Sequence, residues 1–464
     1  MIHAYKLNGY NIILDVGSGA IHWVDELAYE AICLYDNKGR DASYEMIINK
    51  HKEMDRSEID ELFIDIDELV GHQKLFAADG LSETAITKRE EQLESEGIEV
   101  GKAYKALCMN VSHSCNMLCE YCFAGKGEYG GKESLMPLEI GKKAIDYLIA
   151  NSNERRNLDV DFFGGEPLIN WNTVKEIVLY AREKEKDTEK RFRFTLTTNG
   201  LLIDDDIIDF TNKHMYNVVL SLDGRRETHD GKRKYPNGEG TYAVVLPNIR
   251  RLVESRNGKG YYIRGTFTRD NRDFLDDILH IADMGFSEIS LEPIVTKKDD
   301  TEGFVIDDLP ILFDQYENLA IQMINREREG RGFSFYHFML DLVNGPCLHK
   351  RIAGCGVGTE YLAVTPNGEL YPCHQFVGNE QFLMGDVIYG ITNVALYNKF
   401  LHTGIHSRSD CESCWARFYC SGGCSANAWN SSGDINGIYE FGCELFKKRI
   451  ECAIMIKVAE SATA

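Results

Sequence analysis

The sequence lacks the features that would place the chain in or on a membrane. It has no apolar run of about 18 residues, the length that a membrane-spanning helix needs. Its first residues, Met1–Tyr10, lack the charged-then-apolar layout of a secretory signal peptide. We therefore expect a cytoplasmic protein with no membrane partner.

Basic residues are also scarce. The chain has 51 Lys and Arg against 73 Asp and Glu, a net charge of −22, and no Lys/Arg stripe stands out. Phosphate backbones are bound by basic faces, so this balance argues against a nucleic-acid partner. The excess of acidic residues is sufficiently explained by solubility, because a large net charge keeps a protein soluble.

The 14 cysteines take their meaning from the expected compartment. The cytoplasm keeps thiols reduced, so cysteines there are more often metal ligands than disulfide partners. With 464 residues, 44% of them hydrophobic, the chain can bury more than one core. Its length predicts about three domains.

The first 78 residues predict a small independent module. Two turn signals, Asn8-Gly9 and Gly17-Ser18-Gly19, separate short strand-like runs. The expected strands are His3–Leu7, Asn11–Asp15 and Ala20–Val24. Helical patterns follow at Leu27–Leu34, Tyr44–His51 and Ser57–Leu69. Residues 79–104 are expected to be a linker, whose charged part, Glu83–Glu99, is a linker or an exposed helix.

Residues 105–330 alternate between strand and helix patterns. The expected strands are Ala106–Val111, Leu158–Phe163, Arg191–Thr197, Val218–Leu222, Tyr262–Thr268 and Glu288–Leu291, with helices such as Leu138–Ala150, Val174–Lys184 and Phe274–Met284 between them. Such alternation indicates an α/β fold with a parallel sheet and right-handed crossovers. Six strands are too few for a closed eightfold barrel, so we expect an open, partial one. Residues 331–464 are rich in cysteine, show little periodicity and suggest a region stapled by metal rather than by a large core.

Cys115, Cys119 and Cys122 form a C-x3-C-x2-C motif directly after the first expected barrel strand. Three thiolates on one loop can hold three irons of a [4Fe–4S] cluster and leave the fourth iron open, whereas most ferredoxin-type sites supply four cysteines. The alternatives are a zinc site completed by His113, or plain buried cysteines.

The stretch Cys115–Cys122 resembles the signature loop of the radical S-adenosylmethionine (SAM) superfamily. The resemblance continues at the carboxyl ends of the strands, where barrel active sites lie. The matching segments, in strand order, are Gly164-Gly165-Glu166-Pro167, Thr198-Asn199-Gly200, Ser221-Leu222-Asp223-Gly224, Arg264-Gly265-Thr266 and Glu292-Pro293. The resemblance implies a partial (β/α)6 radical SAM barrel, in which an electron from the cluster cleaves SAM and a 5′-deoxyadenosyl radical abstracts a substrate hydrogen.

The resemblance and the chemistry of SAM together assign the cofactor site. Gly164 and Gly165 would let backbone groups approach SAM, and Glu166 would pair with its amino group. The candidates for the carboxylate and ribose hydroxyls are Ser221, Arg233 and Arg264; for Arg233, within His229–Arg233, the alternative is a solvated charge run. In the family the residues at the positions of Tyr121 and Phe123 lie against the adenine, and Asn199, Asp223 and Leu291 complete the expected cofactor-binding set.

A second group of cysteines follows the barrel. Cys355, Gly368 and Cys373 form C-x12-G-x4-C, and a C-x2-C-x5-C-x3-C run precedes a last cysteine; these five are Cys411, Cys414, Cys420, Cys424 and Cys443. A zinc ribbon is the alternative, but seven cysteines do not fill tetrahedral zinc sites evenly.

The spacing of this second group resembles the SPASM domain of radical SAM peptide maturases, which holds two auxiliary [4Fe–4S] clusters, so three clusters are implied in all. By resemblance, one auxiliary cluster is held by Cys411, Cys414, Cys420 and Cys443, and the other by Cys355, Cys373 and Cys424 with Cys347 as a candidate fourth ligand. Cys33, Cys108 and Cys452 match no motif and are expected to be small buried hydrophobes.

The first module resembles the winged-helix-like leader-peptide recognition domain found with ribosomally made, modified peptides. Such a module offers a free strand edge to an extended peptide, here Ala20–Val24 or its neighbour; the alternative is a structural cap on the barrel. Nearly the whole chain resembles the thioether-forming maturases of six-cysteines-in-forty-five (SCIFF) peptides. This implies that a cysteine sulfur of a Cys-rich precursor peptide is joined to an acceptor carbon, with ferredoxin or flavodoxin as electron donor. A carbon–carbon crosslink, Ser/Cys oxidation, or a non-catalytic iron–sulfur or zinc protein that binds peptides are the open alternatives.

Overall fold

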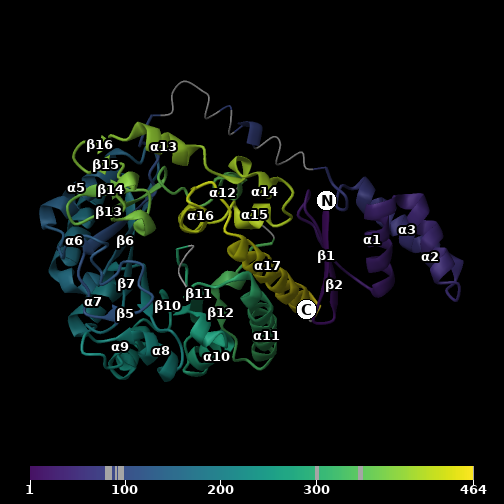
Figure 1. Ribbon diagram of the computed structural model, residues 1–464, viewed down its shortest axis with the longest axis horizontal. Helices are drawn as coiled ribbons and strands as arrows, with labels where there is room; N and C mark the ends of the chain where they lie inside the picture. Colours follow the sequence, from purple (N-terminus) through teal and green to yellow (C-terminus); the bar gives the residue numbers. More distant parts are fainter. Residues whose placement is uncertain (79–85, 89–90, 92–98, 298–301, 343–347, 463–464) are drawn as a thin grey trace.

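The computed structural model describes residues 1–78, 86–88, 91, 99–297, 302–342 and 348–462. Most of the expected linker Glu83–Glu99, and Cys347, lie outside these residues. Figure 1 shows an N-terminal module (purple) on one side, an α/β sheet (blue to teal) on the other, and the cysteine-rich part (green to yellow) above and between them. No helix of the described parts is long and apolar enough to cross a bilayer.

The N-terminal module has the expected order of three strands followed by three helices. Its antiparallel sheet, in the order β1-β2-β3, comprises β1 (Ile2–Leu7), β2 (Tyr10–Asp15) and β3 (Ile21–Val24). Asn8 and Gly9 have positive φ angles of 50° and 83°, which a tight two-residue hairpin requires. The helices are α1 (Glu26–Lys38), α2 (Arg40–Lys50) and α3 (Arg56–Gly71), with Asp25 and Asp55 capping the amino ends of α1 and α3.

The module is not independent of the rest of the chain, contrary to the expectation from its sequence. Alternate residues of its sheet point to opposite faces. On one face Ile13 joins the apolar core that α1, α2 and α3 close around Phe63. On the other face Tyr5, Leu7, Ile12 and Leu14 belong to the same buried cluster as the barrel. The sheet therefore packs between its own helices and the body of the protein.

All six expected barrel strands are confirmed as neighbouring parallel strands. In spatial order they are β11 (Glu288–Pro293), β10 (Tyr261–Phe267), β8 (Asn217–Ser221), β7 (Arg191–Thr198), β6 (Asn157–Gly164) and β4 (Ala106–Ser112). The crossover helices include α5 (Leu138–Ala150), α6 (Trp171–Asp187), α7 (Asp205–His214), α8 (Arg226–Lys232), α9 (Tyr242–Ser255) and α10 (Phe274–Asp283). A separate two-stranded ribbon pairs β5 (Leu118–Cys119) with β9 (Arg233–Lys234).

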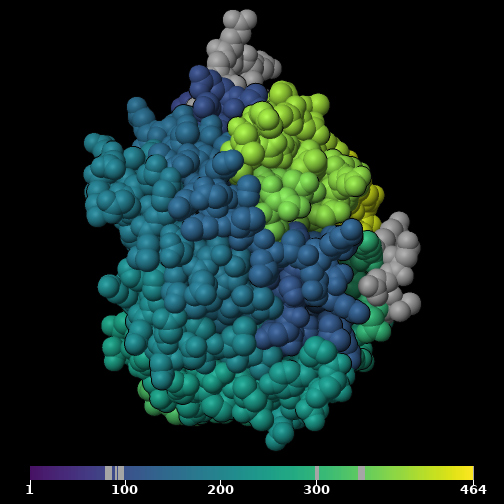
Figure 2. Space-filling view, turned by 90° about the vertical axis from the view of Figure 1, so that its left-hand side faces the viewer, coloured from purple at the N-terminus to yellow at the C-terminus, as the bar shows by residue number. Residues whose placement is uncertain are grey.

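The cysteine-rich part is built into this sheet, so the expectation of a region without a sizeable core is wrong. After α11 (Leu309–Arg328), the short β12 (Ser334–Phe335) pairs with β11. The other flank is formed by β13 (Tyr361–Val364), parallel to β4, and then by the antiparallel strands β14 (Glu369–Tyr371), β15 (Gly385–Asp386) and β16 (Gly390–Ile391). Figure 2 shows this part (green) seated directly on the barrel (blue). The domain boundary at residues 330/331 stays a prediction.

The C-terminal helix α17 (Glu440–Ser461) is the main element that the sequence did not predict. Eleven of its residues are buried, among them Leu445, Arg449 and Ile454. It packs along α11 and also contacts β1 of the N-terminal module. In Figure 1, α17 (yellow) lies between the barrel and that module. One helix thus joins all three parts of the chain.

We expect Phe63→Ala to unfold the helical half of the N-terminal module selectively. Phe63 is fully buried, and truncating a buried Phe costs about 3–5 kcal/mol, a large share of what a module of this size can supply. Hydrogen exchange should show lost protection in α1–α3 and unchanged protection in the barrel strands. The control is Met46→Ala, at an exposed position of α2. Equal loss in the barrel would contradict this prediction.

Candidate cluster and cofactor site

The loop that carries Cys115, Cys119 and Cys122 leaves the carboxyl end of β4 and is held in place by β9. Cys119 of β5 pairs with Arg233 of β9. All three thiols are half-buried, and burial raises the pKa of Cys115 to about 12 and that of Cys119 to about 11. Without a metal these groups would therefore be neutral thiols at pH 7. An iron cluster fits them because coordination deprotonates a thiol outright.

Polar groups from two separate segments, the end of β7 and the strand β9, face the sulfurs of this loop. The side-chain amide of Asn199 lies 3.8 Å from the sulfur of Cys115 and donates to Asn116 at 2.8 Å. The guanidinium of Arg233 lies 4.0 Å from the sulfur of Cys119. Hydrogen bonds to coordinating sulfurs tune the potential of a cluster, so both residues are placed to act on it.

Tyr121, Asp223 and Arg233 form a buried group beside the loop. The Arg233 Nε donates to Asp223 at 3.0 Å, and the Tyr121 hydroxyl donates to the same carboxylate. Although burial alone would raise the pKa of Asp223, the adjacent Arg233 holds it below its usual value. The guanidinium also lies over the Tyr121 ring, 5.5 Å from its centre. The alternative of a solvated charge run is therefore wrong for Arg233, which is buried.

Gly164 and Gly165 are needed for a close approach between two segments of the protein itself. A Cβ on Gly164 would lie 2.2 Å from the carbonyl oxygen of Ser112, and one on Gly165 would lie 2.4 Å from that of Ser114. The amide of Gly165 donates to Ser112 at 2.8 Å. These glycines dock the end of β6 against the start of the cluster loop, whatever they also offer to a cofactor.

The carboxylate of Glu166 is buried and already bound by three donors. Its oxygens accept from the Thr198 hydroxyl and the Asn199 amide, each at 2.8 Å, and from the Leu168 amide at 3.0 Å. Burial nevertheless raises the pKa of Glu166 to about 7. An ammonium group would be a fourth donor, which a carboxylate with four lone-pair sites can accept.

The remaining residues of the expected cofactor site lie in different surroundings. Ser221 ends β8 and stands in register with Arg264 of β10. Arg264 is exposed although its strand lies inside the sheet, so its side chain faces the open lumen of the barrel. The ring of Phe123 is half exposed and near the rings of Tyr129 and Phe163. Leu291 is fully buried in the apolar core, so only its backbone is available to a cofactor.

The division of the second group of cysteines into two ligand sets stays a prediction, and the pKa shifts of these thiols show which sulfurs influence one another. The pKa of Cys420 is raised to about 12 by burial and then by Cys443, Cys411 and Cys414. That of Cys373 is raised by burial and then by Cys424, Cys355 and Cys108. The last five cysteines of the chain's motifs lie on or beside α14 (Ser409–Glu412), α15 (Arg417–Cys420), α16 (Ser425–Ser432) and the first turn of α17, whereas Cys355 follows α12 (Leu348–Ala353) and Cys373 follows β14.

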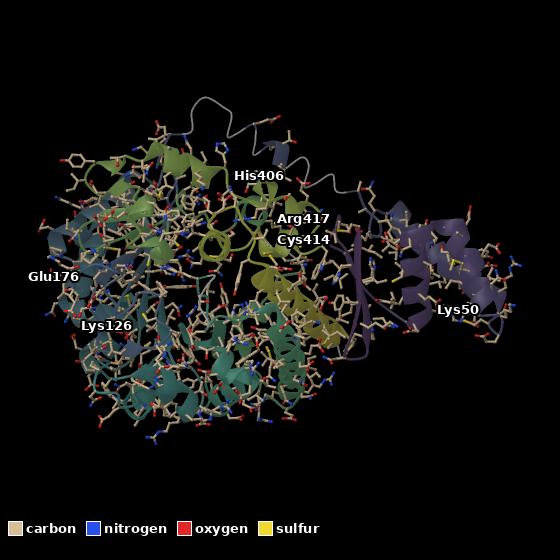
Figure 3. The ribbon with its side chains drawn as sticks, viewed as in Figure 1. Lys50, Lys126, Glu176, His406, Cys414 and Arg417 are labelled. Carbon is tan, nitrogen blue, oxygen red and sulfur yellow. The ribbon has the colours of Figure 1, made fainter. Side chains whose placement is uncertain are left out.

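The two sets have the donors that auxiliary clusters require, although no three described His, Cys, Asp or Glu side chains converge as a single metal ion needs. Figure 3 marks Cys414 in this region together with Arg417, which donates to the Cys414 carbonyl at 2.9 Å. Of the unassigned cysteines, Cys108 and Cys452 are buried as expected, and Cys33 is only half-buried.

Sequence reasoning missed Arg408, which is buried among the cysteine groups. The side chain donates to the carbonyl oxygen of Ile435 at 2.7 Å. Burial lowers the pKa of Arg408, and Cys411, Cys420, Cys424 and Cys443 oppose that shift, so the guanidinium lies near both sets. Its place three residues before Cys411 is the only sequence signal.

Comparison with known proteins agrees with this geometry. The Radical SAM superfamily model matches residues 109–280, and the SPASM model, an iron–sulfur cluster-binding domain, matches residues 355–415. The radical SAM cyclopropyl synthase TigE of Paramaledivibacter caminithermalis is 23% identical, over 86% of this chain and 84% of its own length. The structure of native anSMEcpe with bound AdoMet has a TM-score of 0.62 at 20% identity and covers 76% of this chain and 99% of its own. Streptococcus suis SuiB bound to its precursor peptide SuiA has a TM-score of 0.54 at 16% identity, with 95% and 98% coverage.

We expect the triple variant Cys115→Ala, Cys119→Ala, Cys122→Ala to lose reductive SAM cleavage and to keep its auxiliary clusters. Bound iron should fall from about 12 to about 8 atoms per chain if each cluster has four irons. Iron analysis and 5′-deoxyadenosine formation after reduction measure the two effects, with Cys33→Ala as the control. Wild-type 5′-deoxyadenosine formation by the triple variant would contradict the assignment.

We expect Glu166→Gln to weaken SAM binding by about ten- to hundred-fold, the usual value of a charge-assisted hydrogen bond. Because burial raises the pKa of Glu166 to about 7, the wild-type carboxylate is neutralised below that pH. SAM affinity should therefore fall in the wild-type protein as the pH drops through 7, and the Gln variant should lack this step. Calorimetry over pH 6–8 with anaerobic protein would measure both; matching pH profiles would remove Glu166 from the SAM site.

Proposed function

We propose that this chain, in which a radical SAM α/β fold is joined to a SPASM domain, installs thioether crosslinks in a ribosomally made Cys-rich precursor peptide. The observation that supports this proposal is the combination in one chain of three features. These are a three-cysteine loop at the carboxyl end of a partial barrel, two further cysteine sets, and an N-terminal sheet with an accessible edge. A thioether is formed from a thiol and a C–H bond with the loss of two hydrogens.

Three [4Fe–4S] clusters and SAM fit the donors present. When bound, they supply one-electron cleavage of the sulfonium and removal of a hydrogen atom from the peptide. The protein's own side chains bind and orient the cofactor and the peptide, and they exclude water. Asp223 fixes Tyr121 and Arg233 against the cluster loop, and Glu166 holds the ends of β6 and β7 together.

The N-terminal module is proposed to bind the leader of the precursor. Among the described strands, β3 has a partner on one side only, which leaves its other edge available to an added strand. Trp23 on this strand is half exposed and packs edge-on against Tyr10. SuiB, whose fold covers this module as well, was solved with a precursor peptide bound. A cytoplasmic site of action and ferredoxin or flavodoxin as electron donor belong to the same proposal.

Other modifications of a peptide are the second candidate. The similarity to TigE, a cyclopropyl synthase, and to anaerobic sulfatase-maturating enzymes makes a carbon–carbon bond or Ser/Cys oxidation the specific alternatives. These products differ in their remaining thiols, because a thioether consumes one thiol per bridge and a carbon–carbon bond consumes none.

The test is anaerobic co-expression with the Cys-rich peptide encoded beside this gene, followed by mass spectrometry. We expect a loss of two hydrogens per bridge and one fewer alkylated cysteine for each. The Cys115/Cys119/Cys122→Ala variant is the matched control and should leave the peptide unchanged. A loss of two hydrogens with every thiol still open to alkylation would favour a carbon–carbon crosslink or Ser oxidation and overturn the thioether.

The leader-docking part is tested better by a point change than by deletion, because removing the module would expose α17. The amide of Asp15 donates to the carbonyl of Ala20 at 2.9 Å, so by antiparallel alternation the Trp23 amide points away from β2. We expect Trp23→Pro, which removes that donor, to abolish crosslinking of full-length precursor more strongly than Trp23→Ala, which keeps it. Equal activity of the two variants would exclude strand addition at β3.

A further inference from the structure

A buried polar network stands behind the carboxyl end of β11 and has no part in the site described so far. His337 lies on the neighbouring η4 turn (Tyr336–Phe338), and its Nε2 is 2.7 Å from a carboxylate oxygen of Glu292. Arg449 of α17 donates to the Nδ1 of His337 at 2.9 Å and twice to the Tyr316 hydroxyl, at 3.0 and 2.7 Å. Four segments far apart in the sequence meet here.

The hydrogen bonds fix the charge of each member of the network. Because Arg449 donates to Nδ1, the proton of a neutral His337 must lie on Nε2, which is 2.7 Å from Glu292 but not aligned for a hydrogen bond to it. Burial and Arg449 lower the pKa of His337, which keeps it neutral. Burial alone would raise the pKa of Glu292, but His337, Arg449 and Arg264 together lower it. Glu292 is therefore an ionised carboxylate that is paired with His337 and Arg449.

The need to neutralise the charge of Arg449 does not by itself explain why a carboxylate, that of Glu292, lies at this position. The guanidinium lies 3.9 Å from the second carboxylate oxygen of Glu292, farther than its contacts with Tyr316 and His337. The Glu292 side chain is still 28% exposed, and His337 and Arg449 are close to fully covered. One oxygen of Glu292 thus lies beside His337 and the other faces Arg449, while the side chain as a whole keeps part of its surface accessible.

The position of Glu292 suits contact with a peptide above the cofactor. Glu292 stands in register with Thr266 of β10, and Arg264, a candidate SAM partner, lies two residues deeper on the same strand. The helix that supplies Arg449 also reaches the N-terminal module. There, Glu451 pairs with His3 at 3.0 Å and accepts from the Tyr5 hydroxyl at its backbone oxygen, also at 3.0 Å. The helix α17, which lies between the barrel and that module in Figure 1, thus connects the surroundings of Glu292 to the module.

We propose that Glu292 binds a backbone N–H of the precursor peptide beside the residue that loses its hydrogen, with His337 and Arg449 as positioning residues. An extended peptide presents N–H donors at every second residue, and a preoriented carboxylate is a strong acceptor for one of them. The proposal rests on the proposed function, because it needs a peptide in the barrel. It adds a peptide subsite on β11, two strands away from the Asp223 group on β8.

The experiment uses anaerobic holoenzyme and synthetic full-length Cys-rich peptide encoded beside this gene. For Glu292→Gln, which keeps the side-chain shape and removes the charge, the peptide KM should rise about ten- to hundred-fold. The dissociation constant for SAM should change by less than about twofold. Glu288→Gln is the matched control, because Glu288 lies on the same face of β11 at its opposite end and should leave both constants unchanged.

A double variant separates peptide binding from a purely structural role. If Glu292 only neutralises Arg449, removing both charges in Glu292→Gln/Arg449→Met should restore the peptide KM, because replacing both partners of a buried pair costs little. Under our proposal the double variant stays as weak as Glu292→Gln. Arg449→Met alone should raise the peptide KM less than Glu292→Gln does, because it acts through His337.

The outcomes are distinguishable. An unchanged peptide KM in Glu292→Gln, recovery in the double variant, or a loss confined to SAM binding would each overturn the proposal. If melting temperatures show that Glu292→Gln does not fold, Glu292→Asp replaces it, and a partial rise in peptide KM is then expected. Wild-type enzyme that cleaves SAM but leaves the peptide unmodified would refute the proposed function itself.

Discussion

The buried carboxylate of Asp223 is the contact on which the geometry of the site depends. It accepts from Tyr121 of the cluster loop, from Arg233 of β9 at 3.0 Å and from the Thr266 amide of β10 at 2.9 Å. A carboxylate without partners would be very costly at this depth, so the three donors are needed together. Since they come from separate segments, satisfying Asp223 also sets the height of the cluster loop above the strand ends.

The helix α17 likewise contacts three parts of the chain at once. Its first turn carries Cys443, its middle carries Arg449 behind β11, and Glu451 next to it meets the N-terminal module. The stack of His3 on Trp415, with ring centres 3.7 Å apart, adds a second contact between the module and the cysteine-rich part. The module is therefore held in one orientation relative to the barrel, which a peptide spanning both would require.

Local sequence patterns were sufficient to predict the strands and helices that have one apolar face and one polar face. The barrel strands alternate between apolar residues that pack on helices, such as Leu158 and Val160, and polar ones that face the lumen, such as Asp159 and Asp161. The helix α17 is buried on most of its surface and has no such contrast, and β12, β15 and β16 are two residues long, too short for any pattern. These elements depend on long-range packing.

The candidate site likewise contains residues that local sequence patterns indicate and residues that they do not. Cysteine spacing is informative for Cys115, Cys119 and Cys122, because the one short loop that carries them limits how far apart they can lie. Spacing carried no information about Arg233, whose charged neighbours suggest solvent, because its burial depends on Asp223 ten residues away. The Glu292 network was equally hidden, since His337 and Arg449 follow it by dozens of residues and no motif connects them.

Under the proposed function, in which a carbon radical attacks the peptide, the polar lumen has a physical rationale. A radical is uncharged, so electrostatic attraction cannot guide it to one hydrogen among many; only the relative positions of its precursor and the peptide can. Positions are held well by charged groups that are themselves fixed. Asp159 and Arg193 pair with contacts of 2.6 and 2.7 Å near the start of their strands, and His337 and Arg449 pair with Glu292 at the end of β11. Such preoriented groups need no rearrangement when the ligands arrive, and the selectivity of hydrogen abstraction then depends on the rigidity of the barrel.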